Sequence, residues 1–272
     1  MGAQNISWPA LGLSFLLLAL PLAIFVLLRV RMARTLLWSA ARMSVQLLLV
    51  GAFLVYIFEW NNHLLTAAWL LAMIMFAAFS VVGTTGLRYG RYAGLVFLAF
   101  LLSSLPVLLY FNGLVLRLTD FLEARYAVAI TGMLLGNSLG GVIVGIGDFY
   151  RSIGRDEGRY QYLLAAGATR YEALAPYLRD GIALALKPAL ANMATMGLVF
   201  LPGMMTGQIL SGEPPLLAVR YQIAIVIAIF VCVALTAVLS LLLTLAVSFD
   251  AFGNLRRDIF RERRSPKREG RP

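Results

Sequence analysis

The chain has 272 residues, of which 61% are hydrophobic and only 13% are charged. Soluble domains carry about 25% charged residues, so this composition, with apolar runs of about 20 residues, excludes an ordinary soluble domain. The runs are continuous rather than alternating, which argues against a membrane β-barrel. The composition therefore predicts an all-α, polytopic helical membrane protein.

The net charge of +10 does not indicate nucleic-acid binding, because the basic residues stand at the ends of the apolar runs, where they set membrane orientation. A single cysteine, Cys232, excludes a disulfide framework. With one histidine, His63, the chain also cannot build a metal site from a cluster of His and Cys. We therefore expect a lipid bilayer and no nucleic acid as its surroundings, and the metal ligands, if any, stay unknown.

About seven membrane segments follow one another along the chain. The first has no basic residue before its apolar run and several arginines after it, which predicts a retained helix with its N-terminus outside rather than a cleaved signal peptide. The approximate limits of the segments are 8–28, 36–58, 64–87, 93–111, 126–147, 181–210 and 219–247.

The basic residues divide unequally between the two sides that this layout defines. One side receives the polar stretch 148–180 and the C-terminal run, and the positive-inside rule makes it the cytoplasm. We expect one domain over 1–255 in a bacterial inner membrane, followed by a basic, disordered cytoplasmic tail over 256–272 that is attracted to anionic lipid. The outer side receives only Arg117, Arg125 and Arg220.

The fifth segment carries a stripe of small residues. Gly132, Gly136 and Gly140 stand four residues apart, and Gly141 and Gly145 form a second pair with that spacing. Small residues at this spacing let another helix approach closely. The partner helix belongs either to the same protomer or to a dimer or pathway face, and the spacing alone does not choose between them.

The sixth segment is predicted to break at Pro202 and Gly203, because proline lacks an N–H and glycine loosens the same turn. The break is either a simple kink or the end of a helix that lines a substrate site. Thioether and oxygen donors crowd this stretch, and polar side chains interrupt the fifth segment. The candidate pathway residues are Asn137, Ser138, Thr195, Met196, Met204, Met205, Thr206 and Gln208.

The polar stretch between the fifth and sixth segments has the signals of a rigid elbow. Residues 159–166 read as a short helix, and Gly167 suits the left-handed residue that ends it. Thr169 and Glu172 form the T-x-x-E capping box of a second short helix, which Pro176 is expected to stop or bend within two turns. Such an elbow fits a groove on a soluble partner; the alternative is an amphipathic loop on the membrane surface.

The run LLAAGATRYEAL over 163–174 resembles the cytoplasmic coupling loop of ABC-transporter permeases, whose hallmark is E-A-A-x-x-x-G. The hallmark acid has no equivalent here. Together with GNSLGG (136–141), LPGMMTGQILSG (201–212) and RYQIAI (220–225), the run resembles the FetB family of iron-export permeases, over nearly the whole chain. The residues that match the centre of the coupling loop are Ala165, Ala166, Gly167, Ala168 and Thr169.

The resemblance implies half of a transporter. A separate FetA-like subunit would bind ATP and Mg²⁺ and contact the elbow, and two copies of this chain would form the pathway for a metal ion or metal complex, with export of iron as the family's activity. The chain has no G-x-x-x-x-G-K-[ST] phosphate loop, so we expect neither enzymatic activity nor a cofactor in it. The residues expected to couple the elbow to the ATPase are Ala165, Ala166, Gly167, Ala168, Thr169 and Glu172.

Two other functions are compatible with the residues. A secondary transporter would need no ATPase partner, but the apolar segments hold no Asp, Glu or His relay for coupled protons. A membrane scaffold that transports nothing would keep the elbow and need no pathway.

Overall fold

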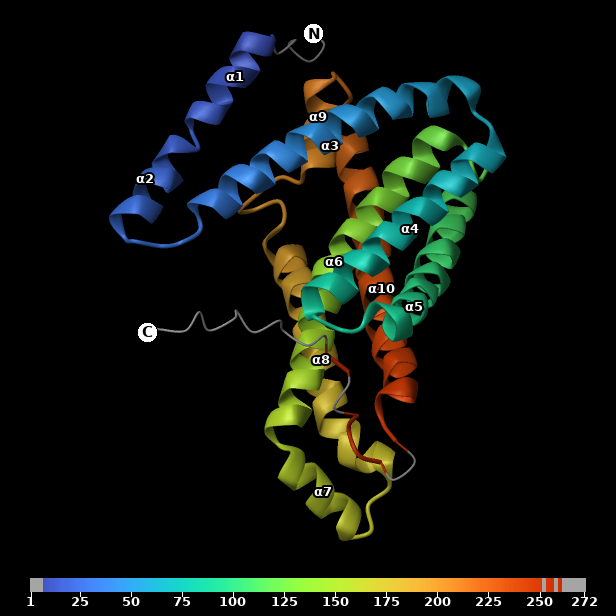
Figure 1. Cartoon of the computed structure of the whole chain (residues 1–272). Helices are drawn as coiled ribbons and strands as arrows, with labels where there is room; N and C mark the ends of the chain where they lie inside the picture. Colours follow the sequence, from blue (N-terminus) through green and yellow to red (C-terminus); the bar gives the residue numbers. More distant parts are fainter. Residues whose placement is uncertain (1–6, 251–252, 257–258, 261–272) are drawn as a thin grey trace.

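The computed structural model describes residues 7–250, 253–256 and 259–260, and in these residues the chain forms helices joined by short turns (Figure 1). The elements are α1 (Trp8–Leu16), α2 (Ala19–Leu27), α3 (Ala33–Trp60), α4 (His63–Thr85), α5 (Tyr89–Tyr110), the π-helical turn η1 (Phe111–Val115), α6 (Ala124–Arg155), α7 (Glu157–Ala165), α8 (Arg170–Thr195), α9 (Gly203–Leu210) and α10 (Pro215–Ser248).

Within the described residues, six helical stretches are long and apolar enough to cross a membrane. They are Trp8–Leu27, Ala33–Trp60, His63–Thr85, Tyr89–Val115, Ala124–Arg155 and Pro215–Ser248. The prediction of an all-α, polytopic membrane protein is therefore confirmed. The seventh predicted segment, 181–210, is not one continuous span: it is divided between the end of α8, a break and α9.

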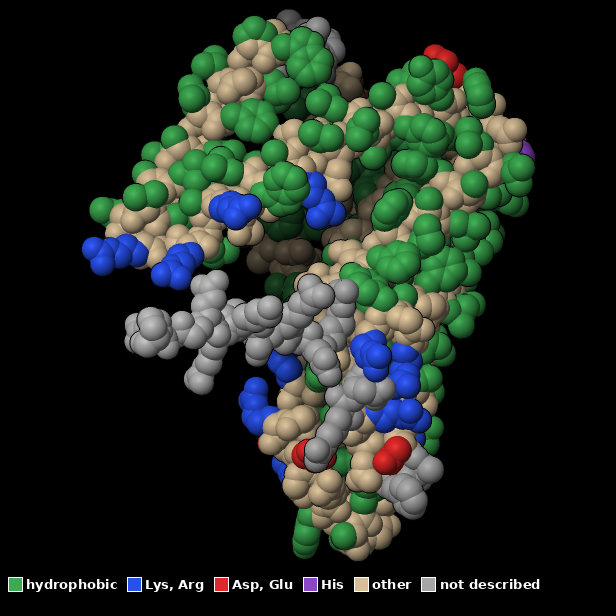
Figure 2. Space-filling model, in the orientation of Figure 1, with side chains coloured by type: hydrophobic (Ala, Val, Ile, Leu, Met, Phe, Trp, Pro, Cys, Tyr) green, Lys and Arg blue, Asp and Glu red, His purple; other side chains and the backbone are tan. Residues whose placement is uncertain are grey.

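The packed body consists of α4, α5, α6, α8 and α10, with α6 and α10 contacting most of the others. The helices α1, α2 and α3 lie to one side of this body, where Figure 1 shows them as the blue arm. Large apolar side chains on the arm are exposed, among them Trp8, Leu27 and Trp38. Figure 2 shows hydrophobic side chains over most of this part of the molecule, with Lys and Arg at its lower edge and again between the packed body and α7. This surface suits lipid rather than water.

The glycine stripe of α6 serves two different surfaces. A Cβ added at Gly141 would lie 2.7 Å from the carbonyl oxygen of Ala185 in α8, and one added at Gly145 would lie 2.8 Å from that of Gly181. Glycine therefore permits the close contact between α6 and α8 inside one protomer. Gly136 and Gly140 meet nothing within 4 Å and leave a smooth, open face.

A ladder of small polar residues runs down α10 with a spacing of four, and we did not predict it. All of its members are buried. Thr236 Oγ1 lies 2.6 Å from Ser103 Oγ of α5, and Tyr150 Oη lies 2.6 Å from Ser248 Oγ. The ladder holds α5, α6 and α10 together by hydrogen bonds, as polar residues do between membrane helices. Its members are Cys232, Thr236, Ser240, Thr244 and Ser248.

The chain stays packed after α10. Ile259 is only 1% exposed, and its carbonyl oxygen accepts a hydrogen bond of 3.1 Å from the backbone N–H of Arg88, in the turn between α4 and α5. The packed part thus continues beyond the expected domain limit at residue 255. The rest of the predicted basic tail, 261–272, lies outside the described residues.

Candidate functional site

The elbow between α7 and α8 forms as its sequence predicts. Gly167 has φ +92°, which an L-amino acid rarely adopts. Its N–H donates to Leu164 O, and the N–H of Ala168 donates to Leu163 O, both at 3.0 Å. These two bonds are the Schellman motif, which satisfies the last carbonyl groups of a helix. The turn therefore depends on glycine at position 167.

The capping box on the other side of the turn is also present. The backbone N–H and the hydroxyl of Thr169 each lie 2.7 Å from Glu172 Oε2, and Thr169 Oγ1 accepts from the N–H of Glu172 at 3.4 Å. The hydrogen bonds from Thr169 hold the pKa of the Glu172 carboxyl below its usual value. Since the carboxylate is the form that accepts two such bonds, the box is complete at neutral pH.

The predicted second short helix is wrong, because α8 does not stop at Pro176. It continues through Pro176 and Pro188 to Thr195. A proline removes one backbone hydrogen bond, but α8 packs along α6 and against α10, and Gly181 and Ala185 meet α6 closely. Tertiary packing therefore outweighs the local stop signal, and one helix runs from the elbow deep into the body.

Two side chains fasten the elbow to the end of α10. The Arg170 Nη2 donates to Leu245 O at 2.9 Å, and the guanidinium carbon lies 4.4 Å from the ring centroid of Phe249. Tyr160 Oη donates to Gly253 O at 2.6 Å. Burial raises the pKa of Tyr160, more than the nearby Arg170 lowers it, so the phenol stays protonated and donates.

The tip of the elbow is a free surface within the described part of the chain. Tyr162 is 72% exposed and Tyr171 is 69% exposed, and Ala165, Ala166 and Gly167 between them are exposed as well. The inner side of the same elbow is buried through Tyr160, Ala173 and Leu174. Exposed tyrosines on a rigid, well-seated turn are typical of a protein-docking surface.

At its far end α8 breaks earlier than predicted. The last helical residue is Thr195, Met196 is already extended, and Gly197 has φ +85°. Phe200 O accepts a hydrogen bond of 2.9 Å from the N–H of Gly197, which closes a small turn. Pro202 is the N-cap of α9 rather than a kink inside a helix. The break is thus a separate turn over 196–202, not the single point expected at Pro202 and Gly203.

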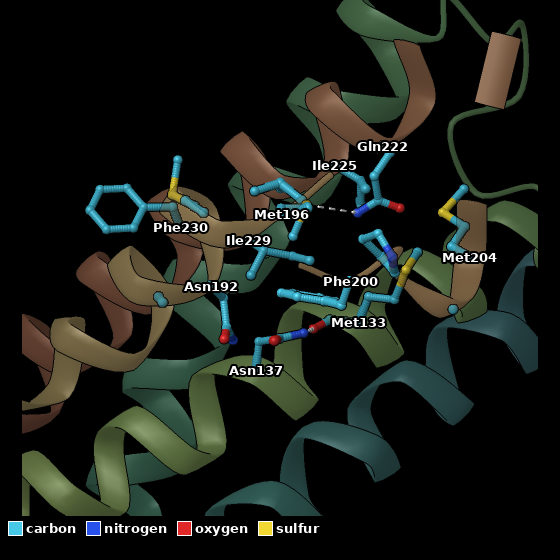
Figure 3. Close-up of a pocket in the computed structure, with 15 residues that line it drawn as sticks. Met133, Asn137, Asn192, Met196, Phe200, Met204, Gln222, Ile225, Ile229 and Phe230 are labelled. Carbon is cyan, nitrogen blue, oxygen red and sulfur yellow. Dashed lines mark hydrogen bonds between the residues drawn. The ribbon is translucent and has the colours of Figure 1, made fainter. Parts of the chain in front are cut away.

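A cavity of about 330 Å³ lies beside this turn, between α6, the end of α8 and α10 (Figure 3). On α6 it is lined by Met133 and Asn137, which lie about 14 to 20 Å from the first residue of that helix at 1.5 Å per residue. Since a bilayer's apolar core is about 30 Å thick, the cavity lies near mid-membrane.

The cavity offers neutral donor groups. Its lining includes three carboxamides, those of Asn137, Asn192 and Gln222, and four thioethers. Among the residues that the structure describes, none that lines this cavity is charged. Nor do the described residues contain any group of three or more His, Cys, Asp or Glu that could hold a metal ion. The four thioethers belong to Met133, Met193, Met196 and Met204.

Gln222 is the buried polar group of this cavity. It is 7% exposed, and its Nε2 lies 3.9 Å from Met196 Sδ, a weak contact drawn as a dashed line in Figure 3. Its Oε1 accepts no hydrogen bond from any residue that the structure describes. A buried carbonyl oxygen without a partner costs about 1–3 kcal/mol, so this oxygen is suited to a bound ligand or water.

A second cavity of about 430 Å³ adjoins the first toward the starts of α6 and α10. Met133 and Met204 line both cavities. The second cavity adds charged groups, Arg125 and Glu213, and the half-buried Gln208. We call the first cavity, whose described lining is neutral, the inner cavity, and the second, whose lining includes charged groups, the outer cavity. The thioethers of Met133 and Met204 lie between them.

The structure brings together some of the predicted pathway residues and separates others. Asn137, Met196 and Met204 line the inner cavity, and Gln208 lines the outer one. Ser138 is fully buried and donates to Cys232 Sγ at 3.5 Å, so it joins helices instead of lining the cavity. The remaining three, Thr195, Met205 and Thr206, line neither cavity.

Four lining residues with a thioether or carboxamide side chain were missed by the sequence reasoning: Met133, Asn192, Met193 and Gln222. Met133 precedes Asn137 by four residues on α6, and Asn192 of α8 precedes Met196, the residue directly after that helix, by four. Residues four apart share a helix face. A search for thioethers and carboxamides at that spacing in apolar helices would have found both pairs.

Comparisons with known proteins agree with the predicted resemblance. The model of the Uncharacterised protein family (UPF0014) matches residues 8–249. The probable iron export permease protein FetB of Escherichia coli K12 is 29% identical over 248 residues, which cover 90% of this chain and 93% of FetB. The UPF0014 membrane protein YjkA of Bacillus subtilis 168 is 30% identical over 224 residues, 81% of this chain and 86% of YjkA.

A plant protein is similar over a shorter stretch. The UPF0014 membrane protein STAR2 of rice is 32% identical over 196 residues, 70% of this chain and 65% of STAR2. The chain matches no solved structure.

Proposed function

Since the chain belongs to the uncharacterised membrane-protein family UPF0014, we propose that it is the membrane-spanning permease subunit of an ABC transporter. Its substrate would be iron or a related metal, exported across a bacterial inner membrane. The name of the similar protein FetB, a probable iron export permease, supports permease activity and the metal substrate. The ATPase partner is supported by the elbow and by its link to the cavity.

The observation that carries the proposal is the course of α8. This one helix begins at the elbow with Arg170 and reaches the cavity with Asn192, while Met196 follows directly after its end. At the other side of the cavity, α10 contributes Gln222 and Ile225, and its opposite end is bonded to the elbow through Leu245. Any displacement of the elbow therefore acts on two walls of the cavity.

The exposed tip of the elbow is the proposed contact for a FetA-like subunit, which would hold ATP and Mg²⁺. The Schellman turn and the capping box fix the shape of the tip on both sides of Gly167. Because the tip has a fixed shape, a displacement imposed by the partner subunit moves α8 as well. A flexible loop would change its own conformation instead. The residues assigned to this contact are Ala165, Ala166, Gly167, Ala168, Thr169 and Glu172.

A second copy of the chain is proposed to cover the open face of α6. Asn137 and Asn192 line the cavity and are exposed in one protomer. Carboxamides at mid-membrane depth are costly against lipid and face protein or water instead. Gly136 and Gly140 make the same face smooth enough for close approach. A homodimer would thus enclose the cavity between two chains.

The charge distribution supports the orientation of the subunit. In Figure 2, Lys and Arg gather between the packed body and α7 and at the lower edge of the α1–α3 arm. The turn between α4 and α5 also carries basic residues. We therefore assign the elbow and the C-terminus to the cytoplasm and the N-terminus to the outside.

Reconstitution tests the proposal. Proteoliposomes with the chain and its cognate ATP-binding subunit should move iron or a related metal only with ATP and Mg²⁺, and the chain alone should not move the metal under a proton or sodium gradient. Gradient-driven flux by the chain alone would instead establish a secondary transporter. ATP turnover that no metal stimulates, with no flux, would favour a scaffold.

A further inference from the structure

The donor groups of the inner cavity point to a narrower class of substrate. We propose that this cavity binds a soft, singly charged d¹⁰ cation, Cu(I) or Ag(I), through the thioether sulfurs of Met133, Met196 and Met204. This inference rests on the proposed function, because it takes the cavity as the substrate site of the permease and replaces the broad class of metals with one kind of ion.

Because the described lining of the cavity carries no charge, an ion with a low charge is favoured there. None of the described residues that line the cavity carries a formal charge, and the cavity lies near mid-membrane. The cost of transferring an ion from water to such a site rises with the square of its charge, and it is repaid only by ligands. Hard divalent and trivalent ions are held by carboxylates, which this cavity does not provide. A singly charged ion has the smallest cost.

The sulfur atoms set the softness of the ion. Thioethers select Cu(I), while imidazole and carboxylate suit the other common metals. Methionine also fills irregular cores, but here Met133, Met196 and Met204 border an open cavity on three separate parts of the chain: α6, the turn after α8, and α9. Met133 and Met204 line both cavities. Their thioethers would therefore pass the ion from the inner cavity to the outer one.

The side chain of Gln222 gives a second, independent indication that the cavity binds a ligand. Its buried Oε1 has no partner among the described residues, and its Nε2 makes only the 3.9 Å contact with Met196 Sδ. The thioether is therefore oriented by a weak donor that a cation can displace. The free carbonyl oxygen can complete the coordination with an oxygen donor, in place of a carboxylate that would bring charge.

Metal binding to the purified full chain in lipid nanodiscs tests the inference, with Ag(I) nitrate by calorimetry and Cu(I) by competition with a chromophoric chelator under reducing conditions. The triple variant Met133→Leu, Met196→Leu and Met204→Leu keeps the side-chain volume and removes the sulfurs. We expect it to bind Ag(I) about tenfold more weakly or worse, as for loss of groups that support a metal site. X-ray absorption at the copper edge should show sulfur neighbours only in the unsubstituted chain.

Two variants serve as controls. Met205→Leu removes the neighbouring thioether of α9, which lines neither cavity, and Cys232→Ser removes the thiol; both should bind Ag(I) as the unsubstituted chain does. No Ag(I) or Cu(I) binding above that of empty nanodiscs, or equal binding by the triple variant, overturns the inference. ATP-driven flux of iron with no flux of Cu(I) or Ag(I) would overturn it as well, while leaving the permease function intact.

Discussion

Arg170 is the residue at which the elbow and α10 are joined. Its guanidinium donates to Leu245 O at 2.9 Å and lies over the ring of Phe249. Leu245 is in the last turn of α10, where the carbonyl groups have no partner inside the helix and the helix dipole favours a positive charge. The planar, charged guanidinium can donate to the carbonyl group, interact favourably with the helix dipole and lie over the aromatic ring at the same time. We therefore assign Arg170 the role of a positioning residue that transmits movement of the elbow to the cavity.

Replacement of Arg170 by Met should uncouple the transporter. The change removes a charged hydrogen bond worth about 1.5–3 kcal/mol and the contact with Phe249. The surface of the tip is unchanged, so the ATP-binding subunit should still bind with unaltered affinity, whereas metal flux per ATP hydrolysed should fall. Arg170→Lys should recover part of the coupling, because it keeps the charge but not the planar group. Equal loss of flux and of partner binding would show that Arg170 acts only on folding.

Glu172 gives the elbow a predictable response to pH. Its pKa is held below the usual value by the bonds from Thr169, so the capping box is complete at and above the ordinary glutamate pKa. Its contribution to stability is lost as the pH falls through the lowered pKa. Titration of the Glu172 carboxyl carbon by NMR should give a midpoint below the usual value for glutamate, and Thr169→Ala should move that midpoint upward. A midpoint that Thr169→Ala leaves unchanged would contradict the box as the cause.

Among the elements, the pairing of α6 with α8 keeps the elbow attached to the cavity. The two backbones are so close at Gly141 and Gly145 that neither position has space for a methyl group. Farther along α6, Gly136 and Gly140 lie on an open face with ample space. Spacing alone could not separate these two roles, because the identity of the facing helix depends on contacts between distant parts of the chain.

The substitution Gly145→Ala should destabilise the protomer, and Gly140→Ala should not. The added Cβ at 145 would lie 2.8 Å from Gly181 O and 3.0 Å from the Cβ of Ala185, so the helices must separate. Overpacking of this kind costs about 1–3 kcal/mol. Thermal unfolding of the monomer in detergent measures the difference. If the two variants lose stability equally, α6 and α8 do not pack as described.

The same elements show which features a sequence can predict. The turn at Gly167 and the Thr169–Glu172 box depend only on neighbouring residues, and both form as expected. Pro176 carries an equally clear local signal to end a helix, yet α8 continues because α6 and α10 pack against it. The break at Met196 carries a weaker signal than Pro202 does, so its position was predicted several residues too late.

At the scale of the whole molecule, the candidate site is an assembly of distant segments. The inner cavity takes residues from α6, α8, α9 and α10, and a sequence does not reveal which of its apolar helices meet. Met204 and Asn137 were found through their chemistry alone, whereas Gln222 was hidden in the most apolar of the long helices. The elbow, by contrast, is one continuous segment. This difference explains why the local shape of the elbow could be predicted, apart from the length of the helix that follows it, and the cavity only in part.

We propose that movement of the elbow changes the cavity, and the substitution Gly167→Leu is the sharpest test of this claim. Leucine at φ +92° is strained, so the tip should lose its shape while the membrane helices stay folded. Gly158→Leu, at an exposed position of α7 with ordinary φ, is the matched control. ATP hydrolysis and metal flux are measured in the same proteoliposomes. We predict that Gly167→Leu abolishes metal-stimulated hydrolysis and flux and that Gly158→Leu keeps both; normal flux by a folded Gly167→Leu protein would contradict the claim.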